Sequence, residues 1–434
     1  MSKIKFNSPS LLEVDATMHL AKIQFENGNW KRYEILGEGQ YRKSGSYLVP
    51  SLPVEFHCHG IGDYDFSNLD ELDLERVNVL AEEEGIYCVP SIFLPHHQLD
   101  LFILMMNDFA VKKSNGKLSN ILGISLEGPL LASFAGTPAK GNWAPTKEEW
   151  SMIASCGNLG LIYTVLSPDA MTKDSYLKEQ ITDDHPSIEW IVKTLVENGI
   201  KPALGHFQKN DPIHTSELIK QVIKIAKDTN RFTDSTPVIT DHLFNDMPLN
   251  FKHTWRTSEE RKVRLQELYE SEIQGWSLDN ICEKVGQVPG TLIKAAAAGD
   301  ITICMNFDSE HVDLEIVRKV VELIGTSNII AMTDRIDTDV MCGQELKKNG
   351  ENNLWYQGKG YVAAGSYTID RLMHNIRSIG FNESDIWNLT SFTPLREAHH
   401  LNQLKSREIV PFSFVDETKT RTHLTTTNPE LILV

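Results

Sequence analysis

The chain has 434 residues, and 42 Lys and Arg against 59 Asp and Glu give it a formal net charge of −17. Apolar residues make up 41% and charged residues 23%, a balance that excludes disordered, collagen-like and disulfide-scaffold proteins. Without a block of Lys and Arg, we expect neither a nucleic-acid partner nor an anionic membrane. The six cysteines are scattered without a CxxC pair, and no apolar run suits a signal peptide or a membrane span. We therefore expect a soluble, cytoplasmic protein.

Eight short apolar runs recur along the middle of the chain, each ending at a polar residue and followed by a helix-prone stretch. Continuous apolar strands that alternate with helices are typical of a parallel sheet covered on its outer side. Eight such units in about 290 residues favour an α/β fold, a (β/α)8 barrel of the TIM type. A doubly wound open sheet is the alternative, but no GxGxxG follows the early strands. The runs are residues 54–57, 86–89, 121–126, 161–166, 202–205, 238–240, 301–305 and 329–333.

The two ends of the chain have a different pattern. Residues 1–49 alternate between apolar and polar, and Glu26-Asn27-Gly28-Asn29 is a good hairpin turn signal. Residues 399–434 also contain strand-like runs, at 410–415 and 431–434. We expect both ends to pair into one small β-sandwich domain beside the barrel.

The barrel is expected to occupy residues 50–398, with one irregularity. The gap between the sixth and seventh strands is longer than the others and contains two helix-prone stretches, 258–274 and 277–298. We interpret residues at about 250–300 as a helical insertion, with an oligomer contact or a lid as its possible roles.

Ligand-type side chains end several of the predicted strands. In a barrel of this type the carboxyl ends of the strands form one rim, which carries the active site. His57 and His59 are separated by one residue, so on an extended strand both face the same side, while Cys58 faces the other. Any one such histidine or carboxylate would be explained as an ordinary structural residue, but together they predict a metal site. The candidate ligands are His57, His59, Glu127, His206 and His242, with Asp334 at the same rim.

Imidazole and carboxylate ligands suit Zn²⁺ best, and Fe²⁺, Mn²⁺ and Co²⁺ are alternatives. A divalent metal with an open position would acidify a bound water and polarise a carbonyl group. A further carboxylate beside that water can take its proton and pass it to a leaving group, and Asp334 is the candidate for this catalytic role. The structural alternative for Asp334 is a helix N-cap.

These residues stand in ordered motifs, and with them the chain resembles the N-acetylglucosamine-6-phosphate deacetylase family of the amidohydrolase superfamily. The most specific strings are Leu-Glu-Gly-Pro-Leu at 126–130 and His-Leu-Phe-Asn-Asp-Met-Pro at 242–248. The resemblance covers roughly residues 45 to 400. The other matching segments are 55–60, 205–206, 308–312, 332–334, 364–366 and 394–398.

The resemblance implies a metal held by Glu127, His206 and His242, with Asp334 as general base and acid. His57 and His59 match the positions of a second metal, which some members of the family keep and others lack, so one or two ions are expected. Asn245 and His311 match positions that contact the sugar phosphate or the amide carbonyl. The implied reaction is hydrolysis of an N-acetyl group to an amine and acetate by a homodimeric enzyme acting on a small molecule.

Four departures from the family concern the substrate. Trp143 stands where the family has a substrate-contacting histidine, and it either stacks on a sugar ring or packs on the barrel. Asp246 replaces an alanine that contributes to phosphate binding, and its charge would repel a phosphate if it faced inward. Ser309 replaces a glycine, and the phosphate-binding arginine has no clear counterpart. We therefore keep two alternatives: another superfamily reaction, such as deamination or cyclic-amide hydrolysis, and a catalytically idle binding protein.

Overall fold

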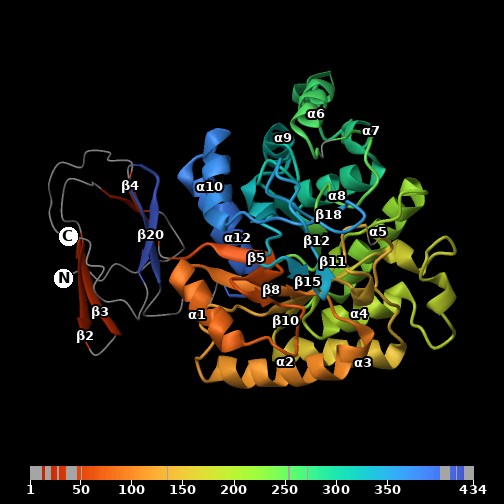
Figure 1. The fold of residues 1–434 in the computed structure, drawn as a ribbon, viewed down its shortest axis with the longest axis horizontal. Coiled ribbons are helices and arrows are strands. Elements are labelled where there is room, and N and C mark those ends of the chain that lie inside the picture. Colours follow the sequence, from red (N-terminus) through yellow and green to blue (C-terminus); the bar gives the residue numbers. More distant parts are fainter. Residues whose placement is uncertain are drawn as a thin grey trace.

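The eight apolar runs form one continuous parallel sheet in the computed structural model (Figure 1). Its strand order is β14-β13-β12-β11-β10-β9-β8-β5, so strands that follow each other in the sequence are neighbours in the sheet. The strands are β5 (Val54–Cys58), β8 (Tyr87–Ile92), β9 (Ile124–Leu126), β10 (Leu161–Leu166), β11 (Lys201–Leu204), β12 (Ile239–His242), β13 (Thr302–Asn306) and β14 (Ile329–Met332). The structure describes residues 12–14, 21–26, 29–35, 46–49, 51–133, 135–252, 255–270, 272–400, 411–416 and 418–424.

Backbone hydrogen bonds at the carboxyl ends of β14 and β5 close the sheet into a barrel. The amide of His59 donates to the carbonyl of Arg335 at 2.7 Å, and the amide of Asp334 donates to the carbonyl of His57 at 3.2 Å. Cys58 and Arg335 also form a parallel β-bridge. The predicted (β/α)8 architecture is therefore confirmed.

Helices cover the outside of the barrel, one or more after each strand (Figure 1). Their starts follow from the sequence, because a polar side chain accepts hydrogen bonds from the first free amides of the helix. Thr146 and Glu149, for example, form a capping box at the start of α3. The main outer helices are α1 (Leu74–Glu84), α2 (Leu99–Ser114), α3 (Lys147–Ser155), α4 (Ile188–Glu197), α5 (Pro212–Thr229), α8 (Gln287–Ala297), α9 (Leu314–Ile324) and α10 (Ile369–Ser378).

Two apolar clusters stabilise this arrangement. The larger one lies between the sheet and the outer helices. The smaller one fills the barrel interior with side chains such as Val54, Phe56, Val165 and Ile239, and it includes Leu395 of α12 (Thr393–Glu397). A TIM-type barrel is packed rather than hollow, so the free space for chemistry lies at its rims.

The long connection after β12 contains α6 (Ser258–Glu270) and α7 (Ile281–Val285) before the barrel helix α8. In Figure 1, α6 projects beyond the other helices at the top of the view. Its side chains are almost all polar or exposed, and only Leu268 is buried. Both predicted stretches are therefore helical: α6 lies in 258–274, and α7 and α8 lie in 277–298.

Strands from both chain ends pair into one antiparallel sheet of order β1-β4-β19-β20. In addition, β2 (Ala21–Glu26) and β3 (Asn29–Ile35) form the hairpin predicted from Glu26-Asn27-Gly28-Asn29. The predicted strand at 431–434 lies outside the described residues. The strands of the sheet are β1 (Leu12–Val14), β4 (Ser46–Val49), β19 (Phe412–Val415) and β20 (Arg421–Leu424).

Short antiparallel strand pairs lie in the loops that follow β5 and β14. They are β6 (Gly60–Ile61) with β7 (Tyr64–Asp65), β15 (Val340–Met341) with β16 (Gln344–Glu345), and β17 (Trp355–Tyr356) with β18 (Val362–Ala364). A short helix, α11 (Glu383–Trp387), follows α10.

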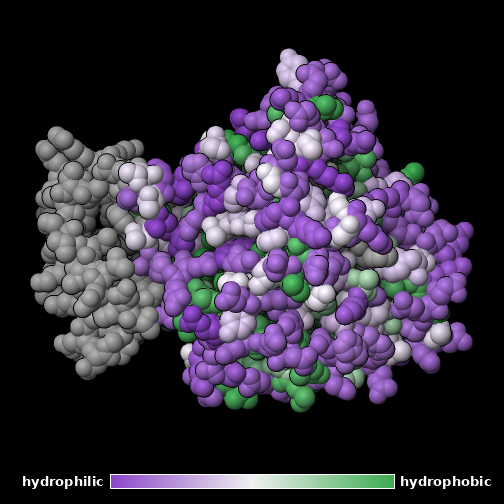
Figure 2. Space-filling model, in the orientation of Figure 1, coloured by the Kyte–Doolittle hydropathy of each residue, from purple (hydrophilic) through white to green (hydrophobic). Residues whose placement is uncertain are grey.

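Hydrophilic residues cover most of the molecular face shown in Figure 2, where apolar residues form small separate patches. None of the described helices combines the length and the apolar composition needed to cross a bilayer.

Candidate metal centre

Seven ligand-type side chains from five strands or the turns after them meet at the carboxyl-terminal rim of the barrel. They form two groups of residues whose donor atoms lie within 4.8 Å of one another in each group. The first group is Glu127, His206, Asp241 and His242, and the second is His57, His59 and Asp334. The barrel strands therefore bring together all six residues predicted for the rim, and they add Asp241.

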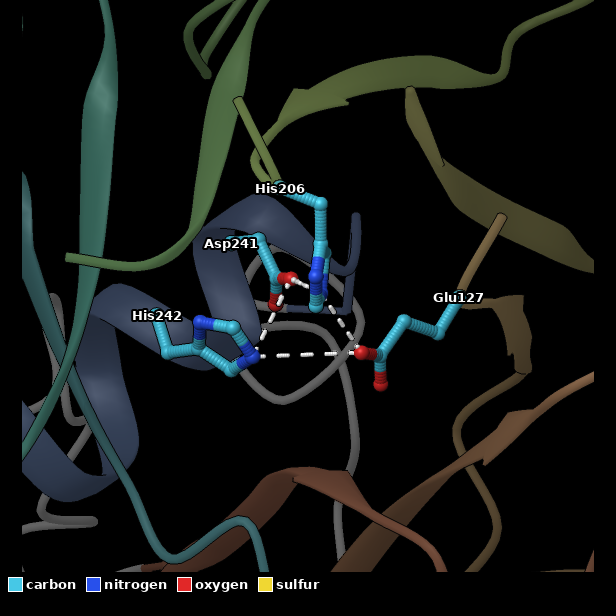
Figure 3. Close-up of side chains that lie close together, drawn as sticks. All are labelled: Glu127, His206, Asp241 and His242. Atoms are coloured by element: carbon cyan, nitrogen blue, oxygen red, sulfur yellow. Dashed lines mark hydrogen bonds and ion pairs between the residues drawn. The ribbon is translucent and has the colours of Figure 1, made fainter. Parts of the chain in front are cut away.

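The first group surrounds one small space, into which its four side chains point (Figure 3). His206 Nε2 lies 2.8 Å from Glu127 Oε1 and 3.0 Å from Asp241 Oδ2. His242 Nε2 lies 3.4 Å from Asp241 Oδ2 and 3.8 Å from Glu127 Oε1. Two imidazole nitrogens and two carboxylate oxygens thus face each other, which is a donor set that fits a divalent transition metal.

The two histidines of the second group face Glu127 of the first group. Glu127 Oε2 lies 3.0 Å from His57 Nε2 and 3.0 Å from His59 Nε2, while its other oxygen faces His206. Asp334 Oδ1 lies 3.2 Å from His59 Nε2 and 3.8 Å from His57 Nε2. One carboxylate therefore lies between two neighbouring sets of donors, with one oxygen toward each set.

Several polar atoms of the centre lack hydrogen-bond partners among the described residues. Both carboxylate oxygens of Asp241, Oδ1 of Asp334 and Nδ1 of His242 are buried in this state. Asp241 Oδ2 is close to two imidazoles, but the angles are not those of hydrogen bonds. Burying a carboxylate without a donor or a counter-charge is costly, so the residues present fit a site that a cation completes.

The electrostatics of the metal-free chain agree with this fit. Burial by itself would lower the pKa of His59, but the nearby carboxylates of Asp334 and Glu127 outweigh it and raise the pKa to about 10. Burial likewise opposes the charged form of His242, while the carboxylates of Asp241 and Glu127 raise its pKa to about 9. Protons on His59 and His242 thus provide positive charge beside the carboxylates when no metal is bound.

Two shifts in strand register change the direction in which ligand side chains point. The register between β5 and β8 shifts between Glu55 and Cys58, at the strand that carries His57. The register between β12 and β13 shifts between Ile239 and His242. Such bulges re-aim side chains beside active sites. As predicted, His57 and His59 face the same carboxylate, whereas Cys58 lies against Cys88 with their sulfurs 3.5 Å apart.

The second register shift explains why Asp241 is absent from the sequence-predicted ligands. Asp241 and His242 are adjacent, and on a regular strand adjacent side chains point to opposite faces. In the structure both approach the same space, where Asp241 Oδ2 lies 3.4 Å from His242 Nε2. The only sequence signal was the Asp-His pair at the end of a predicted strand.

Backbone strain is concentrated at this rim. Five non-glycine residues of the turns after the strands adopt left-handed conformations: His206 (φ 53°), Phe244 (φ 76°), Asp246 (φ 42°), Ser309 (φ 73°) and Asp334 (φ 54°). Such conformations cost of order 1–3 kcal/mol each and cluster at functional sites. Ser309 therefore stands at a position whose geometry suits the glycine that the family has there.

The residues predicted to contact substrate fall into two groups. His311 is buried beside the centre, with Nε2 3.5 Å from Asp334 Oδ2 and Nδ1 paired with Asp308. Asn245 follows the metal-centre strand β12 and donates a 2.8 Å hydrogen bond to Asn306 Oδ1.

Trp143 and Asp246 are engaged with the protein itself. The Trp143 indole donates to the carbonyl of Leu94 at 2.8 Å, its ring stacks on His96, and only 6% of the residue is exposed. This packing leaves little of the ring for a substrate. Asp246 Oδ2 lies 3.0 Å from Nδ1 of His206, so its carboxylate faces a candidate metal ligand.

No family model and no curated protein matches this sequence. Solved structures do match its fold. The N-acetylglucosamine-6-phosphate deacetylase from Pasteurella multocida aligns with a TM-score of 0.65 and 13% identity, over 95% of this chain and 96% of that chain. The enzymes of that name from Mycobacterium smegmatis and Thermotoga maritima align with TM-scores of 0.61 and 0.62 and identities of 16% and 14%, over 93% of each chain. The chain has the fold of these deacetylases.

Proposed function

We propose that this protein is a metal-dependent amide hydrolase that removes the N-acetyl group from an amino sugar, with N-acetylglucosamine 6-phosphate or a related compound as substrate. One observation carries the proposal. Four buried histidines and three buried carboxylates from five strands converge at the active-site rim of a barrel, and some of their oxygens lack partners among the described residues. The shared fold with enzymes of this activity supports it.

Glu127, His206 and His242 would hold the first metal, with Asp241 beside them, and His57 and His59 would hold a second. We propose Zn²⁺, because imidazole and carboxylate donors suit it best. When bound, the ion supplies a water of lowered pKa and polarises the amide carbonyl. The protein's own part is to fix these donors in a buried space that excludes bulk water.

Asp334 is the group we propose to move the proton. Its Oδ1 is buried, has no hydrogen-bond partner among the described residues, and lies 3.2 Å from His59 Nε2. The backbone amide of Asp334 donates a hydrogen bond to the carbonyl of His57, which fixes the backbone that carries this carboxylate. In the reaction Asp334 Oδ1 takes the proton of the attacking water and returns it to the departing amine nitrogen, which releases acetate and a free amino sugar.

His311 is placed to stabilise negative charge on the amide oxygen. Burial opposes the charged form of His311, but the Asp308 carboxylate outweighs burial and raises the pKa of the imidazole above its ordinary value, which favours a proton on Nε2 as well as on Nδ1. Asp308 occupies Nδ1, which leaves Nε2 without a hydrogen-bond partner beside Asp334. A buried, pre-positioned donor at this point is suited to a developing oxyanion.

The most direct experiment measures acetate release from a panel of N-acetyl amino sugars, each with and without a 6-phosphate. A cyclic amide and an aminopurine are added to test the two other superfamily reactions. We expect release of acetate from at least one amino sugar, dependent on added Zn²⁺. Turnover of the cyclic amide or the aminopurine alone would contradict the deacetylase assignment, and no turnover of any substrate would favour an idle barrel.

Within the same panel, the rates with the phosphorylated and unphosphorylated sugars test whether the enzyme recognises a phosphate on its substrate. A much faster reaction with the phosphorylated sugar would show that local groups other than the family's usual ones bind the phosphate. Homodimer formation and a cytoplasmic location stay predictions, which light scattering and cell fractionation would check.

A further inference from the structure

We propose that Asp246 is a positioning residue for the metal centre, which fixes the orientation and tautomer of His206. The proposal rests on the metal site of the proposed function and goes beyond its ligands, because it assigns a role to a residue that would not touch the metal or the substrate.

Both carboxylate oxygens of Asp246 contact partners within the protein. Oδ2 lies 3.0 Å from Nδ1 of His206, on the side of the imidazole that faces away from the other ligands. Oδ1 accepts a 2.8 Å hydrogen bond from the Ser133 hydroxyl and lies 3.0 Å from the ammonium of Lys209. Both oxygens are therefore engaged, and the Asp246 side chain is only 9% exposed.

His206 is the one candidate histidine ligand whose Nδ1 meets a carboxylate hydrogen-bond partner among the described residues. His57 Nδ1 faces the hydroxyl of Tyr163 at 2.9 Å, and His59 Nδ1 faces the carbonyl of Ser91 at 3.2 Å. His242 Nδ1 has no hydrogen-bond partner among the described residues. His57 Nδ1 also lies 3.7 Å from Asp241 Oδ1, which is beyond hydrogen-bond distance. His206 is therefore the imidazole whose Nδ1 is hydrogen-bonded to a carboxylate, and its Nε2 lies closer to Glu127 Oε1 than that of His242 does.

A carboxylate can only accept, so Asp246 fixes the Nδ1 proton of His206 and leaves the Nε2 lone pair for a metal. Nε2 is the atom that points at Glu127 and Asp241 in Figure 3. A carboxylate on the far nitrogen also makes the imidazole a stronger ligand.

The backbone supports the same pairing. His206 and Asp246 both adopt left-handed conformations, and the amide of Phe207, the residue after His206, donates to the carbonyl of Asp246 at 3.1 Å. On the other side, the amide of Ser133 donates to the carbonyl of His206 at 2.9 Å. Two strained turns are thus joined by a backbone bond and a side-chain bond, which holds the imidazole in one orientation.

The experiment compares metal affinity in four proteins: wild type, Asp246→Ala, Asp246→Asn and Asp228→Asn. Asp228 is the matched control, because it is 64% exposed at the end of α5 and its loss changes the net charge equally. Each metal-free protein is titrated with Zn²⁺ in competition with a chromophoric chelator, and its melting temperature is recorded without metal.

We expect Asp246→Ala to raise the Kd for Zn²⁺ about 10- to 100-fold, which is the usual effect of removing such a support. Asp246→Asn keeps an acceptor but loses the charge, so its effect should be smaller, and Asp228→Asn should have none. The metal-free melting temperatures of Asp246→Asn and wild type should stay close, which separates a positioning role from a structural one.

Two results would overturn the inference. One is an unchanged Kd in both Asp246 variants while wild type binds metal. The other is a lower metal-free melting temperature without loss of affinity, which would make Asp246 merely structural. If wild type itself binds no metal, the proposed function fails together with this inference, so the two failures are distinguishable.

Discussion

The two ends of the barrel bury charged groups in opposite ways. At the amino-terminal end, the ammonium of Lys201 donates to Ser235 Oγ at 2.9 Å, to the carbonyl of Thr236 at 2.8 Å and to Glu397. Glu397 also accepts a 3.0 Å hydrogen bond from the Thr302 hydroxyl. Both charged side chains are completely buried, and each has partners from the protein itself.

At the carboxyl-terminal rim, three buried carboxylates compete for the same imidazoles, and oxygens of Asp241 and Asp334 have no hydrogen-bond partner among the described residues. The charges of Lys201 and Glu397 thus balance each other, whereas the carboxylates at the rim require protons on the histidines or a bound cation to balance their charge. This difference agrees with the usual division in barrels of this type, in which the amino-terminal end serves stability and the carboxyl-terminal end carries the active site.

The largest effect is expected at the rim, from Asp334→Asn. The substitution keeps the shape of the side chain but removes the proton acceptor, so kcat for acetate release should fall by about 10²- to 10⁴-fold. Metal content should stay at the wild-type value, because Glu127, His206 and His242 are intact. Steady-state kinetics and metal analysis of the same sample check this, and Asp228→Asn serves as the control. Survival of turnover would remove Asp334 from the proton-transfer role.

At the other end, Lys201→Met should cost stability rather than activity. It leaves the buried Glu397 carboxylate without its counter-charge, and breaking a buried pair in this way typically costs about 3–5 kcal/mol. Urea unfolding measures the change. We expect kcat of the folded variant to stay at the wild-type value, since Lys201 is at the opposite end of β11 from His206.

A double variant sharpens this test. Lys201→Met combined with Glu397→Leu removes both charges, and apolar replacements of buried pairs often recover much of the lost stability. If the double variant were less stable than Lys201→Met alone, the amino-terminal pair would not be the self-contained unit that the comparison requires.

The pH dependence of stability and of metal binding tests the charge balance at the carboxyl-terminal rim. Burial and neighbouring carboxylates set the folded pKa values of His59 and His242 at about 10 and about 9 in the metal-free chain, above the ordinary 6.5. Their contribution to stability is therefore complete below pH 6.5 and is lost as the pH rises through 9 to 10.

A bound metal needs these imidazoles neutral, so it must displace their protons. We expect Zn²⁺ affinity to rise with pH and Zn²⁺ binding at neutral pH to release protons, measured by calorimetry in buffers of different ionisation enthalpy. Binding without proton release would contradict the charge balance proposed for the rim.

The smallest effect is expected from Ser309→Gly. Ser309 has φ 73°, a conformation that glycine adopts without strain, so the substitution should stabilise the protein by about 0.5–1 kcal/mol. Ser327→Gly is the control, because this exposed serine is not among the positive-φ residues and the change should be slightly destabilising. Equal effects of the two substitutions in thermal unfolding would show that the rim stores no strain at Ser309.

The sequence predicted the barrel because its signal is repetitive. Eight apolar runs with helix-prone spacers have few architectures open to them, and each run lies within a few residues of the observed strand. The rim followed from the same rule, since residues that end parallel strands share one edge. Glu127, His206 and His242 are therefore brought together as their places at the strand ends predict.

The remaining features of the site depend on local irregularities that periodicity does not encode. Asp241 enters the centre through a register shift in β12, where the alternation rule gives the wrong face. Asp246 was assigned to the substrate, but left-handed turns at His206 and Asp246 place its carboxylate against the imidazole instead. In neither turn does a glycine occupy the left-handed position itself, although Gly205 directly precedes His206.

The central claim is that the rim requires a divalent cation for amide hydrolysis. Its most direct test titrates chelator-stripped protein with Zn²⁺ and measures acetate release from the best amino sugar of the panel. Activity should be absent without metal, rise in proportion to the metal added, and level off at one or two equivalents per chain. Full acetate release from the stripped protein, or metal bound at the rim without any release, would contradict the account.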